Sequence, residues 1–484
     1  MSETTDLDAQ SLRGFLTMVE RRFPDELLRI RERVDPRFAS TAAVFELERA
    51  GRSPVMVFED LGGLGDLSGQ AHAAGAAPAA RPMPLVTNIA ANRALLAACL
   101  DVSEEALPTA FRERCRSYLP CTVVPRGAWE DVVIEGDDLD LTRLPIPLQF
   151  SVDAAPYITA GQLTARDPET GVDTTGFHRL MLKGRNRLGV SLHSRRRMYE
   201  FHRRAAARGQ NLPVAITLGV HPLHYMGSMV YAYPPDVRKF EIIGGLFGAP
   251  YQLARCGVAD LEVPAGAEII IEGEILADVH EPEGPFGEFT GYASFRSTQN
   301  VFVAHRLRMR RDALFHSVVS GMAKDHILVS CITREGEILN ALKRNLPNVT
   351  GVHVPHSTCG AFTAIIAMRK TAEGEPQMAV MAALGTELYT KHVIVVDDDV
   401  DIFDLNDVFW AIATRVRAEQ DIFFVPGAKG AILDPSSDPQ SFTVTKMGID
   451  ATRPTGRDFA QRLVIDEDER ARARALLERA GIPL

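Results

Sequence analysis

The spacing of apolar side chains predicts an N-terminal region of alternating helices and strands. Over residues 9–33, six apolar residues recur near the spacing of one helical face, and Pro24 is expected to break or kink that helix. The six are Leu12, Phe15, Leu16, Val19, Phe23 and Leu27. Shorter patterns then predict a helix at 42–47, a strand at 54–58, a Gly- and Ala-rich loop at 62–81, a strand at 85–88 and a helix at 90–100. This alternation predicts an α/β domain over residues 1–115.

From residue 116 the pattern changes to many strands with few long helices. Strands are predicted at 157–161, 179–183, 188–192, 214–218, 267–275 and 301–309. A single helical pattern, over residues 196–208, interrupts them. The pattern predicts a barrel or a sandwich over residues 116–312.

A second region of alternating elements follows over residues 313–460. The predicted elements are a strand at 315–319, a helix at 325–342, strands at 349–354 and 361–368, a helix at 377–385, a strand at 392–396 and a helix at 406–416. The remainder, 461–484, carries a charged amphipathic helix at 466–480, which favours packing or subunit contact over a functional site. The fold class is therefore a multidomain mixture of α/β and α+β.

Composition narrows the class of protein. The 484-residue length fits two or three domains, and 46% apolar residues are enough to build cores of that size. The net charge of −10 argues against nucleic acid or an anionic membrane as a partner. Six scattered cysteines, none in a C-x-x-C pair, fit reduced thiols better than disulfides or a zinc site. Because the N-terminus is polar and acidic and no apolar run is long enough to span a bilayer, we expect a cytoplasmic protein.

The stretch from Glu281 to Tyr292 contains three carboxylates, three glycines and two prolines, so the chain is expected to bend there. Glu283 and Glu288 would face apart on a helix or on a straight strand, and a turn is needed to bring both to one cavity. An exposed acidic turn is the plain alternative. The buried strand predicted at 267–275 leads into this stretch and favours a site, with the two carboxylates as an acid/base pair.

Arg179 lies at the start of a predicted strand, directly after Thr174-Thr175-Gly176-Phe177-His178. A buried arginine is costly unless it is paired, so Arg179 marks either a structural salt bridge or a clamp that holds a carboxylate at two points. On the residues alone, His193 is best explained as a residue that makes structural hydrogen bonds. Glu241 is best explained as the charged, solvated end of a strand.

Other polar clusters carry less weight as metal sites. The pairs His221/His224 and His353/His356 lack the helical H-E-x-x-H context of a zinc site. The acidic run Asp397–Asp401 lacks the Gly and the terminal Glu of a calcium loop.

Several of these blocks resemble the UbiD family of prenylated-flavin-dependent decarboxylases. The resemblance is carried by Glu283-Gly284-Pro285-Phe286-Gly287-Glu288 with Gly291-Tyr292, by the segments 174–179, 395–401 and 446–452, and by their order between Asn88 and Pro454. It implies an N-terminal α/β domain, a central split β-barrel that binds prenylated FMN, and a C-terminal α/β domain that forms homodimers or larger homo-oligomers.

The resemblance also implies roles for individual residues. Arg179, Glu283 and Glu288 would be catalytic: Arg179 holds the substrate carboxylate, Glu283 pairs with Arg179, and Glu288 delivers a proton. Mn²⁺ or Mg²⁺, with K⁺ as a further candidate ion, would be bound by Thr174, His193 and Glu241 beside the flavin phosphate. Thr174 stands where the family has Asn, and Lys239, which could not be a metal ligand, competes with Glu241 for the family's acidic position. The implied cofactor-binding residues are Thr174, Phe177, His178, Arg179, His193, Glu241 and Lys446, with surface exposure as the alternative for Lys446.

The function that the resemblance implies is decarboxylation, in some cases reversible, of an aromatic, heteroaromatic or α,β-unsaturated carboxylic acid. A flavin prenyltransferase would supply the cofactor, and the pocket is expected to include Phe289, Thr290, Asp325 and His326. The alternatives are a non-catalytic flavin- or metal-binding scaffold that has kept the fold, and a flavin oxidoreductase. Release of CO₂ from an acid separates the first alternative, and turnover dependent on NAD(P)H separates the second.

Overall fold

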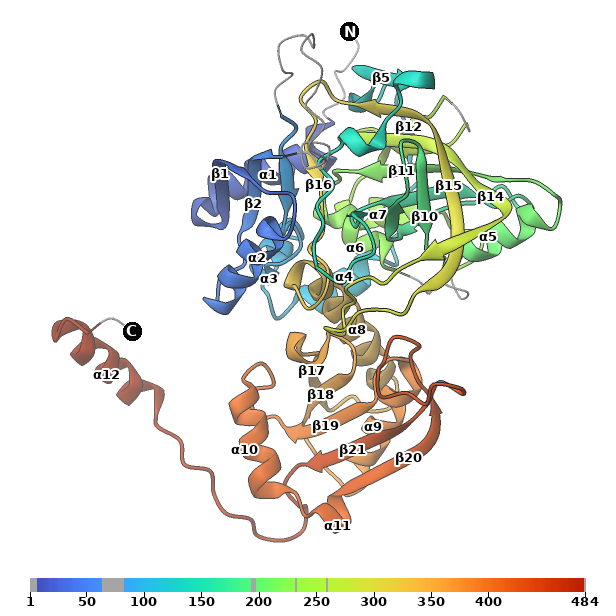
Figure 1. The fold of residues 1–484 in the computed structure, drawn as a ribbon. Coiled ribbons are helices and arrows are strands. Elements are labelled where there is room, and N and C mark those ends of the chain that lie inside the picture. Colours follow the sequence, from blue (N-terminus) through green and yellow to red (C-terminus); the bar gives the residue numbers. More distant parts are fainter. Residues whose placement is uncertain (1–6, 63–81, 193–196, 231–232, 258–259, 483–484) are drawn as a thin grey trace.

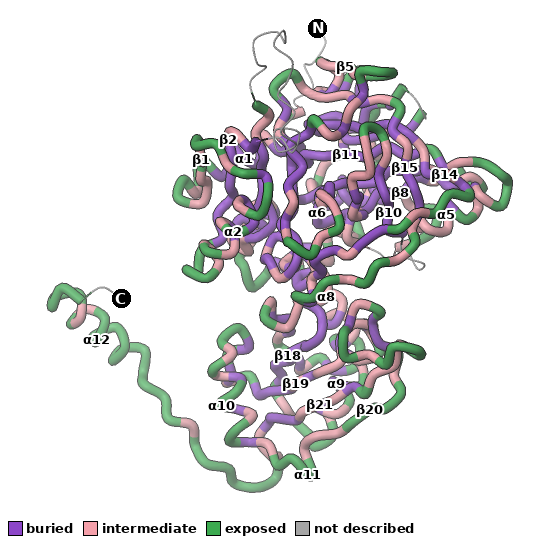
Figure 2. Tube along the Cα trace, in the orientation of Figure 1, coloured by how far each residue is buried: buried purple, intermediate pink, exposed green. Residues whose placement is uncertain are grey.

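The computed structural model describes residues 7–62, 82–192, 197–230, 233–257 and 260–482. The N-terminal and central regions pack against each other, and the C-terminal region lies beside them with a tail that reaches away (Figure 1). Buried positions gather on the strands of each region, whereas the tail is mostly exposed (Figure 2). The chain therefore buries its cores around sheets, as the apolar patterns require.

The N-terminal sheet has the strand order β1-β2-β3-β16 within the described residues. Its elements are α1 (Leu12–Arg22), β1 (Leu27–Val34), α2 (Ala39–Arg49), β2 (Val55–Leu61), β3 (Leu85–Thr87), α3 (Arg93–Cys99) and α4 (Leu107–Arg114). The helix ends at Arg22, so the break predicted at Pro24 is confirmed. The helix predicted after it is wrong, because Leu27–Val34 pair in parallel with β2. Backbone pairing with a neighbouring strand overrides the helical position of Leu27. Apart from Gly62, the predicted loop at 62–81 lies outside the described residues.

A large sheet forms the central region and curls around its own core (Figure 1). The described part of it has the order β6-β9-β10-β15-β14-β11-β7-β8, with β5 beside β15. Its strands are β5 (Val132–Glu135), β6 (Tyr157–Ile158), β7 (Gln162–Arg166), β8 (Asp173–Phe177), β9 (Leu180–Leu182), β10 (Arg187–Val190), β11 (Leu212–Leu218), β14 (Ile269–Glu283) and β15 (Ser297–Met309). A smaller sheet contains β4 (Thr122–Val123), β12 (Gln252–Arg255) and β13 (Glu262–Pro264). The helices are α5 (Arg197–Ala206), α6 (Pro222–Ser228) and α7 (Lys239–Phe247).

Two predictions in this region are corrected. The strand expected to end at Ile275 continues to Glu283, because β15 pairs with it as far as Ser297 opposite Glu283. The turn of the Glu281–Tyr292 stretch therefore begins only at Gly284. Glu241, expected at the end of a strand, lies in the first turn of α7, where its neighbours Ile242 and Ile243 are buried by helix packing.

The C-terminal region is an α/β unit whose described strands follow the order β17-β18-β19-β21-β20. Its elements are β16 (Phe315–His316), which joins the N-terminal sheet, then α8 (Lys324–Lys343), β17 (Val349–His353), β18 (Thr363–Met368), α9 (Glu375–Thr386), β19 (His392–Asp397), α10 (Leu405–Arg415), α11 (Ala418–Asp421), β20 (Ile422–Lys429) and β21 (Thr443–Ala451). The strands β20 and β21 were not predicted, because most side chains of β20 are exposed and give no alternating apolar signal.

The tail ends in α12 (Glu467–Arg479), which has no buried residue. Leu463, just before α12, has an exposed fraction of 97%. Among the described residues, no helix combines the length and the apolar character needed to cross a membrane.

Candidate active site

A pocket opens where the central region meets the C-terminal region, beside α8. Its walls combine aromatic, aliphatic and polar side chains from both regions. The lining residues are Thr159, Phe177, His178, Arg179, Ser191, Tyr225, Met229, Phe286, Glu288, Phe289, Val318, Ser320, His326, Ile327, Ser330, Arg334, Cys359, Tyr389 and Leu433. An apolar cavity with a few convergent polar groups is the usual form of a small-molecule site.

At one wall of the pocket Arg179 lies between two carboxylates. Its Nε and Nη2 donate to the two oxygens of Glu283 at 2.9 and 2.7 Å, and its Nη1 donates to Glu288. The guanidinium also lies over the ring of Phe286, 5.1 Å from its centroid. Glu283 is fully buried and Glu288 is 7% exposed. The predicted pairing of Glu283 with Arg179 is therefore present, and the turn brings Glu288 to the same cation.

The loop after β14 is fixed by hydrogen bonds to its backbone. Asp153 accepts from the N–H of Gly287 at 2.8 Å, and the hydroxyl of Tyr157 accepts from the N–H of Gly284 at 3.2 Å. A side chain at Gly287 would clash, because its Cβ would lie 2.6 Å from the ring of Phe150. These contacts hold Glu288 in place, since it follows Gly287 directly.

Burial and the neighbouring charges set Glu288 apart from an ordinary surface carboxyl group. Burial raises the pKa of Glu288, Arg179 opposes that shift, and the negative charge of Glu283 adds to it. Glu281, the third carboxylate of the stretch, is bound by Lys183 and Arg187 instead. Its slight burial would raise the pKa of Glu281, but the hydrogen bonds and charges of Lys183 and Arg187 lower it. Glu288 is therefore the carboxyl in this loop that is best suited to hold a proton at the pocket.

The strand β8 carries further predicted residues into the pocket wall. The ring of Phe177 packs edge-on against Tyr225, with the centroids 4.1 Å apart. His178 follows directly, and its Nδ1 lies 3.0 Å from the carbonyl oxygen of Ser191. Both Phe177 and His178 line the pocket. Thr174, at the other end of β8, is not among the lining residues, and its hydroxyl lies 2.9 Å from that of Tyr233.

The other predicted ligands are placed differently. Glu241 lies in α7, and its carboxylate accepts from the N–H of Arg238 at 3.2 Å, as a residue in a helix's first turn commonly does. His193 lies outside the described residues. Lys446, on β21, does not line the pocket and is only 5% exposed, so the alternative of surface exposure is wrong. Its ammonium donates to the carbonyls of Leu384 and Leu388 at 3.2 and 3.3 Å, and so supports the segment that carries Tyr389.

Of the four further pocket residues expected, Phe289 and His326 line the cavity, whereas Thr290 and Asp325 do not. Asp325 is fully buried, and its carboxylate accepts from the N–H groups of Asn88 and Ala90 at 2.9 and 3.0 Å. It joins the start of α8 to the N-terminal sheet and is a structural residue.

Sequence reasoning missed Tyr225, Arg334 and Tyr389. Arg334 lies over the ring of Tyr389, 5.3 Å from its centroid, and its Nε lies 3.6 Å from Glu387. The sequence held a signal, because Arg334 interrupts an apolar helical stripe at 327, 331 and 338. A charged residue in such a stripe marks a paired or functional group.

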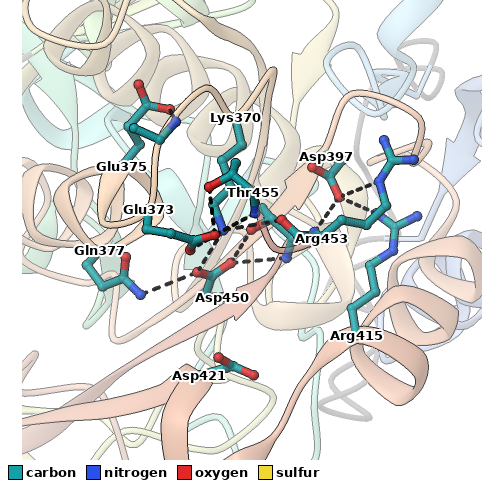
Figure 3. A network of polar contacts seen from close by, with 12 residues as sticks. Lys370, Glu373, Glu375, Gln377, Asp397, Arg415, Asp421, Asp450, Arg453 and Thr455 are labelled. Atoms are coloured by element: carbon teal, nitrogen blue, oxygen red, sulfur yellow. Dashed lines mark hydrogen bonds and ion pairs between the residues drawn. The ribbon is translucent and has the colours of Figure 1, made fainter. Parts of the chain in front are cut away.

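The remaining polar clusters are structural. Burial lowers the pKa of His221 and of His224 to about 3, and the Nδ1 of His224 bonds to the hydroxyl of Tyr251. The acidic run after β19 faces cations, with Asp397 directed at Arg415 and Arg453 (Figure 3). Over the described ranges, no group of three His, Cys, Asp or Glu is arranged to hold a metal ion.

The fold and the site define a class of protein. An aromatic pocket, an arginine that can hold a carboxylate at two points and a buried carboxyl group that can carry a proton are the parts of an enzyme acting on a carboxylic acid. Comparison with known families agrees with this class. Residues 20–115, 122–323 and 326–451 match the N-terminal, the Rift-related and the C-terminal domains of 3-octaprenyl-4-hydroxybenzoate carboxy-lyase. The chain belongs to the UbiD family and is a carboxy-lyase.

Individual relatives are similar over most of the chain. The anhydromevalonate phosphate decarboxylase of Methanothermobacter thermautotrophicus is 38% identical over 315 residues, which are 65% of this chain and 73% of that protein. The structure of the UbiD-class enzyme HmfF from Pelotomaculum thermopropionicum with FMN is 34% identical, with a TM-score of 0.86 over 95% of this chain and 98% of that one. An evolved dimeric form of HmfF with prFMN is 33% identical, with a TM-score of 0.82 and the same shares of the two chains. The predicted three-domain architecture is therefore confirmed.

Proposed function

We propose that this carboxy-lyase binds prenylated FMN in the pocket beside Arg179 and decarboxylates an aromatic, heteroaromatic or α,β-unsaturated acid. The observation that carries the proposal is the buried cluster of Arg179, Glu283 and Glu288 at the pocket wall. The similarity to a decarboxylase and to two UbiD-class complexes with flavins supports it.

Each residue of the cluster has a separate task. Arg179 binds the substrate carboxylate through its guanidinium, which presents paired donors in one plane. Glu283 keeps the guanidinium in orientation through its two hydrogen bonds. As the bond to the carboxyl carbon breaks, CO₂ leaves, and Glu288 delivers a proton to the carbon that held it. One proton therefore replaces one CO₂, and Glu288 regains its proton from solvent.

The pocket residues fit a flavin. Phe177, Tyr225 and Met229 provide apolar walls for a ring system, and the buried hydroxyl of Ser320 has no hydrogen-bond partner among the described residues. An unpaired hydroxyl at a pocket wall is suited to a ligand's polar edge. When bound, the modified flavin supplies the electron sink that side chains lack. Phe177, His178 and Arg179 are the predicted cofactor-binding residues that line this space.

The described members of the predicted metal set do not fit Mn²⁺ or Mg²⁺. Thr174 shares its hydroxyl with Tyr233, and Glu241 uses its carboxylate at the N-terminus of α7. We therefore assign no step of the decarboxylation to Mn²⁺, Mg²⁺ or K⁺.

The test is a panel of aromatic, heteroaromatic and enoic acids, with anhydromevalonate phosphate included because a relative decarboxylates it. Protein coexpressed with a flavin prenyltransferase, which we propose as the cofactor supplier, is incubated with each acid, and CO₂ and the product are measured. We expect one class of acid to release CO₂. Flavin-loaded protein that releases none would favour the scaffold alternative, which the decarboxylase relatives do not favour. Turnover dependent on NAD(P)H would favour the oxidoreductase.

We also propose a homodimer or a larger homo-oligomer, supported by the dimeric form of a relative and by the exposed apolar side chains before α12. A cytoplasmic location is supported by six free cysteines. The boundaries at residues 115, 312 and 460 remain our proposal for the limits of the domains.

A further inference from the structure

The N-terminal end of α7 presents a buried cation to the strand β8. Lys239 is the first residue of α7 and is only 7% exposed. Its ammonium donates to the carbonyl of Ser228 at 2.9 Å and lies 5.5 Å from the centroid of the Tyr233 ring. A lysine ammonium is seldom buried so far from water unless it serves a partner or a ligand.

One face of β8 runs from this cation to the pocket. Thr174 and Gly176 lie on that face, because side chains alternate along a strand, and His178 follows the end of β8 directly. The hydroxyl of Thr174 lies 2.9 Å from that of Tyr233. A Cβ at Gly176 would meet only two atoms of the described chain within 4 Å, Lys239 Nζ at 3.8 Å and the Ser228 oxygen at 4.0 Å. A side chain at Gly176 would therefore touch the ammonium of Lys239, and His178, two residues further along, lines the pocket.

Tyr233 is itself held in place. The guanidinium of Arg197 stacks 3.6 Å from its ring centroid and donates to its carbonyl at 2.8 Å. The ammonium of Lys239 and the hydroxyls of Thr174 and Tyr233 thus form a rigid group of donors beside β8.

Glu241 is turned away from this group. Residues two apart on an α-helix point about 200° apart, so Glu241 lies nearly opposite Lys239 on α7. Its carboxylate is bonded to the N–H of Arg238. A metal ion bound by both Thr174 and Glu241 would have to reach across the helix, whereas the ammonium already lies on the correct side.

We propose that Lys239, with the hydroxyls of Thr174 and Tyr233, binds the phosphate of the flavin directly and takes the place of a divalent cation. An ammonium and two hydroxyls are suitable donors for a phosphate dianion, and they need no metal to offset its charge. This inference rests on the proposed flavin-dependent function. It assigns a phosphate subsite to residues other than the predicted metal ligands.

The experiment compares FMN with riboflavin, which lacks the phosphate. Cofactor-free protein is titrated with each flavin, in EDTA and in Mn²⁺, and binding is followed by flavin fluorescence. For the wild type we expect FMN to bind far more tightly than riboflavin, with less than about a twofold change between EDTA and Mn²⁺. Lys239→Gln should weaken FMN binding about tenfold or more and leave riboflavin unchanged, since a charge-assisted bond is lost. Lys239→Arg should keep most of the affinity for FMN.

Two controls make the result specific. Lys343→Gln makes the same change at the end of α8 and should not alter either flavin's affinity. Glu241→Gln should also leave FMN affinity unchanged. Loss of FMN binding in EDTA, one equivalent of bound metal by elemental analysis, or a large effect of Glu241→Gln would each overturn the inference while leaving flavin binding intact. Equal loss of FMN and riboflavin in Lys239→Gln would also overturn it. Failure of the wild type to bind either flavin would instead count against the proposed function.

Discussion

At the scale of single residues, the site depends on the balance of one cation and two carboxylates. Arg179 neutralises one negative charge, and Glu283 accepts hydrogen bonds from its Nε and Nη2. Glu288 shares the same guanidinium from a buried position, and burial raises its pKa while Arg179 opposes the rise. A carboxyl group in this setting keeps its proton to a higher pH than a surface acid does.

Glu288→Gln should retain cofactor and substrate binding and lower turnover by about 100- to 10,000-fold, because the amide keeps the shape but donates no acidic proton. The measurement is kcat together with solvent deuterium at the product carbon that carried the carboxyl group. Glu281→Gln is the matched control and should keep both, since Glu281 is bound by Lys183 and Arg187. Normal turnover and exchange in Glu288→Gln would show that a neighbouring carboxyl group delivers the proton.

The pH profile of the wild type should follow Glu288. The protonated form is the donor, and its population falls as pH rises through the raised pKa, so kcat should decline on the alkaline side. The residual activity of Glu288→Gln should show no such decline. A wild-type profile identical to that of the variant would show that another group limits the rate.

Arg179→Lys keeps the charge but loses the planar pair of donors. We expect kcat/KM to fall by about tenfold or more. The guanidinium of Arg179 has enough N–H groups to donate two hydrogen bonds to Glu283 and two to the substrate carboxylate, and a lysine ammonium does not. Steady-state kinetics measure the loss, and thermal unfolding checks that the fold is kept. An unchanged kcat/KM would contradict the role of Arg179 as the clamp.

At the scale of elements, α8 connects the N-terminal sheet to the pocket. Its first turn supplies Asp325, which receives backbone N–H groups from Asn88 and Ala90. Five and nine residues further along, the same helix contributes Ser330 and Arg334 to the pocket wall. The orientation of α8 is therefore fixed at one end by a buried carboxylate.

Asp325 gives the protein a pH-dependent stability with a defined sign. Burial raises the pKa of Asp325 from 3.8 to about 6 in the folded state. The folded protein then binds more protons than the unfolded chain in that window, so Asp325 lowers the free energy of unfolding as pH rises from about 4 to 6. Relative to Asp325→Asn, the free energy of unfolding of the wild type should fall by on the order of 3 kcal/mol across this pH range. Denaturant unfolding of both proteins at several pH values measures it, and parallel curves would exclude Asp325 as the source.

At the scale of the whole molecule, the tail is bound to the body of its own chain through Arg462, whose guanidinium donates to Asp407, but its apolar residues are left exposed. Leu463, Val464 and Ile465 have exposed fractions of 97, 74 and 64%, and α12 has no buried residue. Figure 1 shows the tail reaching away from the body. Three neighbouring exposed apolar residues are typical of a contact with another copy.

Removing residues 461–484 should therefore shift the protein toward a smaller assembly. Light scattering after size-exclusion chromatography measures the molar mass of the wild type and of the truncated chain. Replacing Leu463, Val464 and Ile465 by Ser is the matched variant, because it keeps the length and removes only apolar contact. An unchanged mass in both would show that the subunit contact lies elsewhere.

The sequence by itself determined the order of the three regions and most of their elements, because helical and strand patterns repeat over short distances. It also determined that Glu281–Tyr292 must turn and that Arg179 must find a partner, since Gly, Pro and buried charge act locally. Where a residue's position depends on a distant strand, the prediction was wrong: Leu27–Val34 form a strand instead of a helix because they pair with β2.

Only the tertiary structure decided which side chains meet. Glu283 and Glu288 reach Arg179 across more than a hundred residues of chain, and Arg334 and Tyr389 come to the same pocket from a different region. The side of α7 that faces β8 was likewise undetermined in the sequence, where Lys239 and Glu241 are two residues apart. Packing turns Lys239 toward β8, because a helix can present only one of these two side chains to the neighbouring strand.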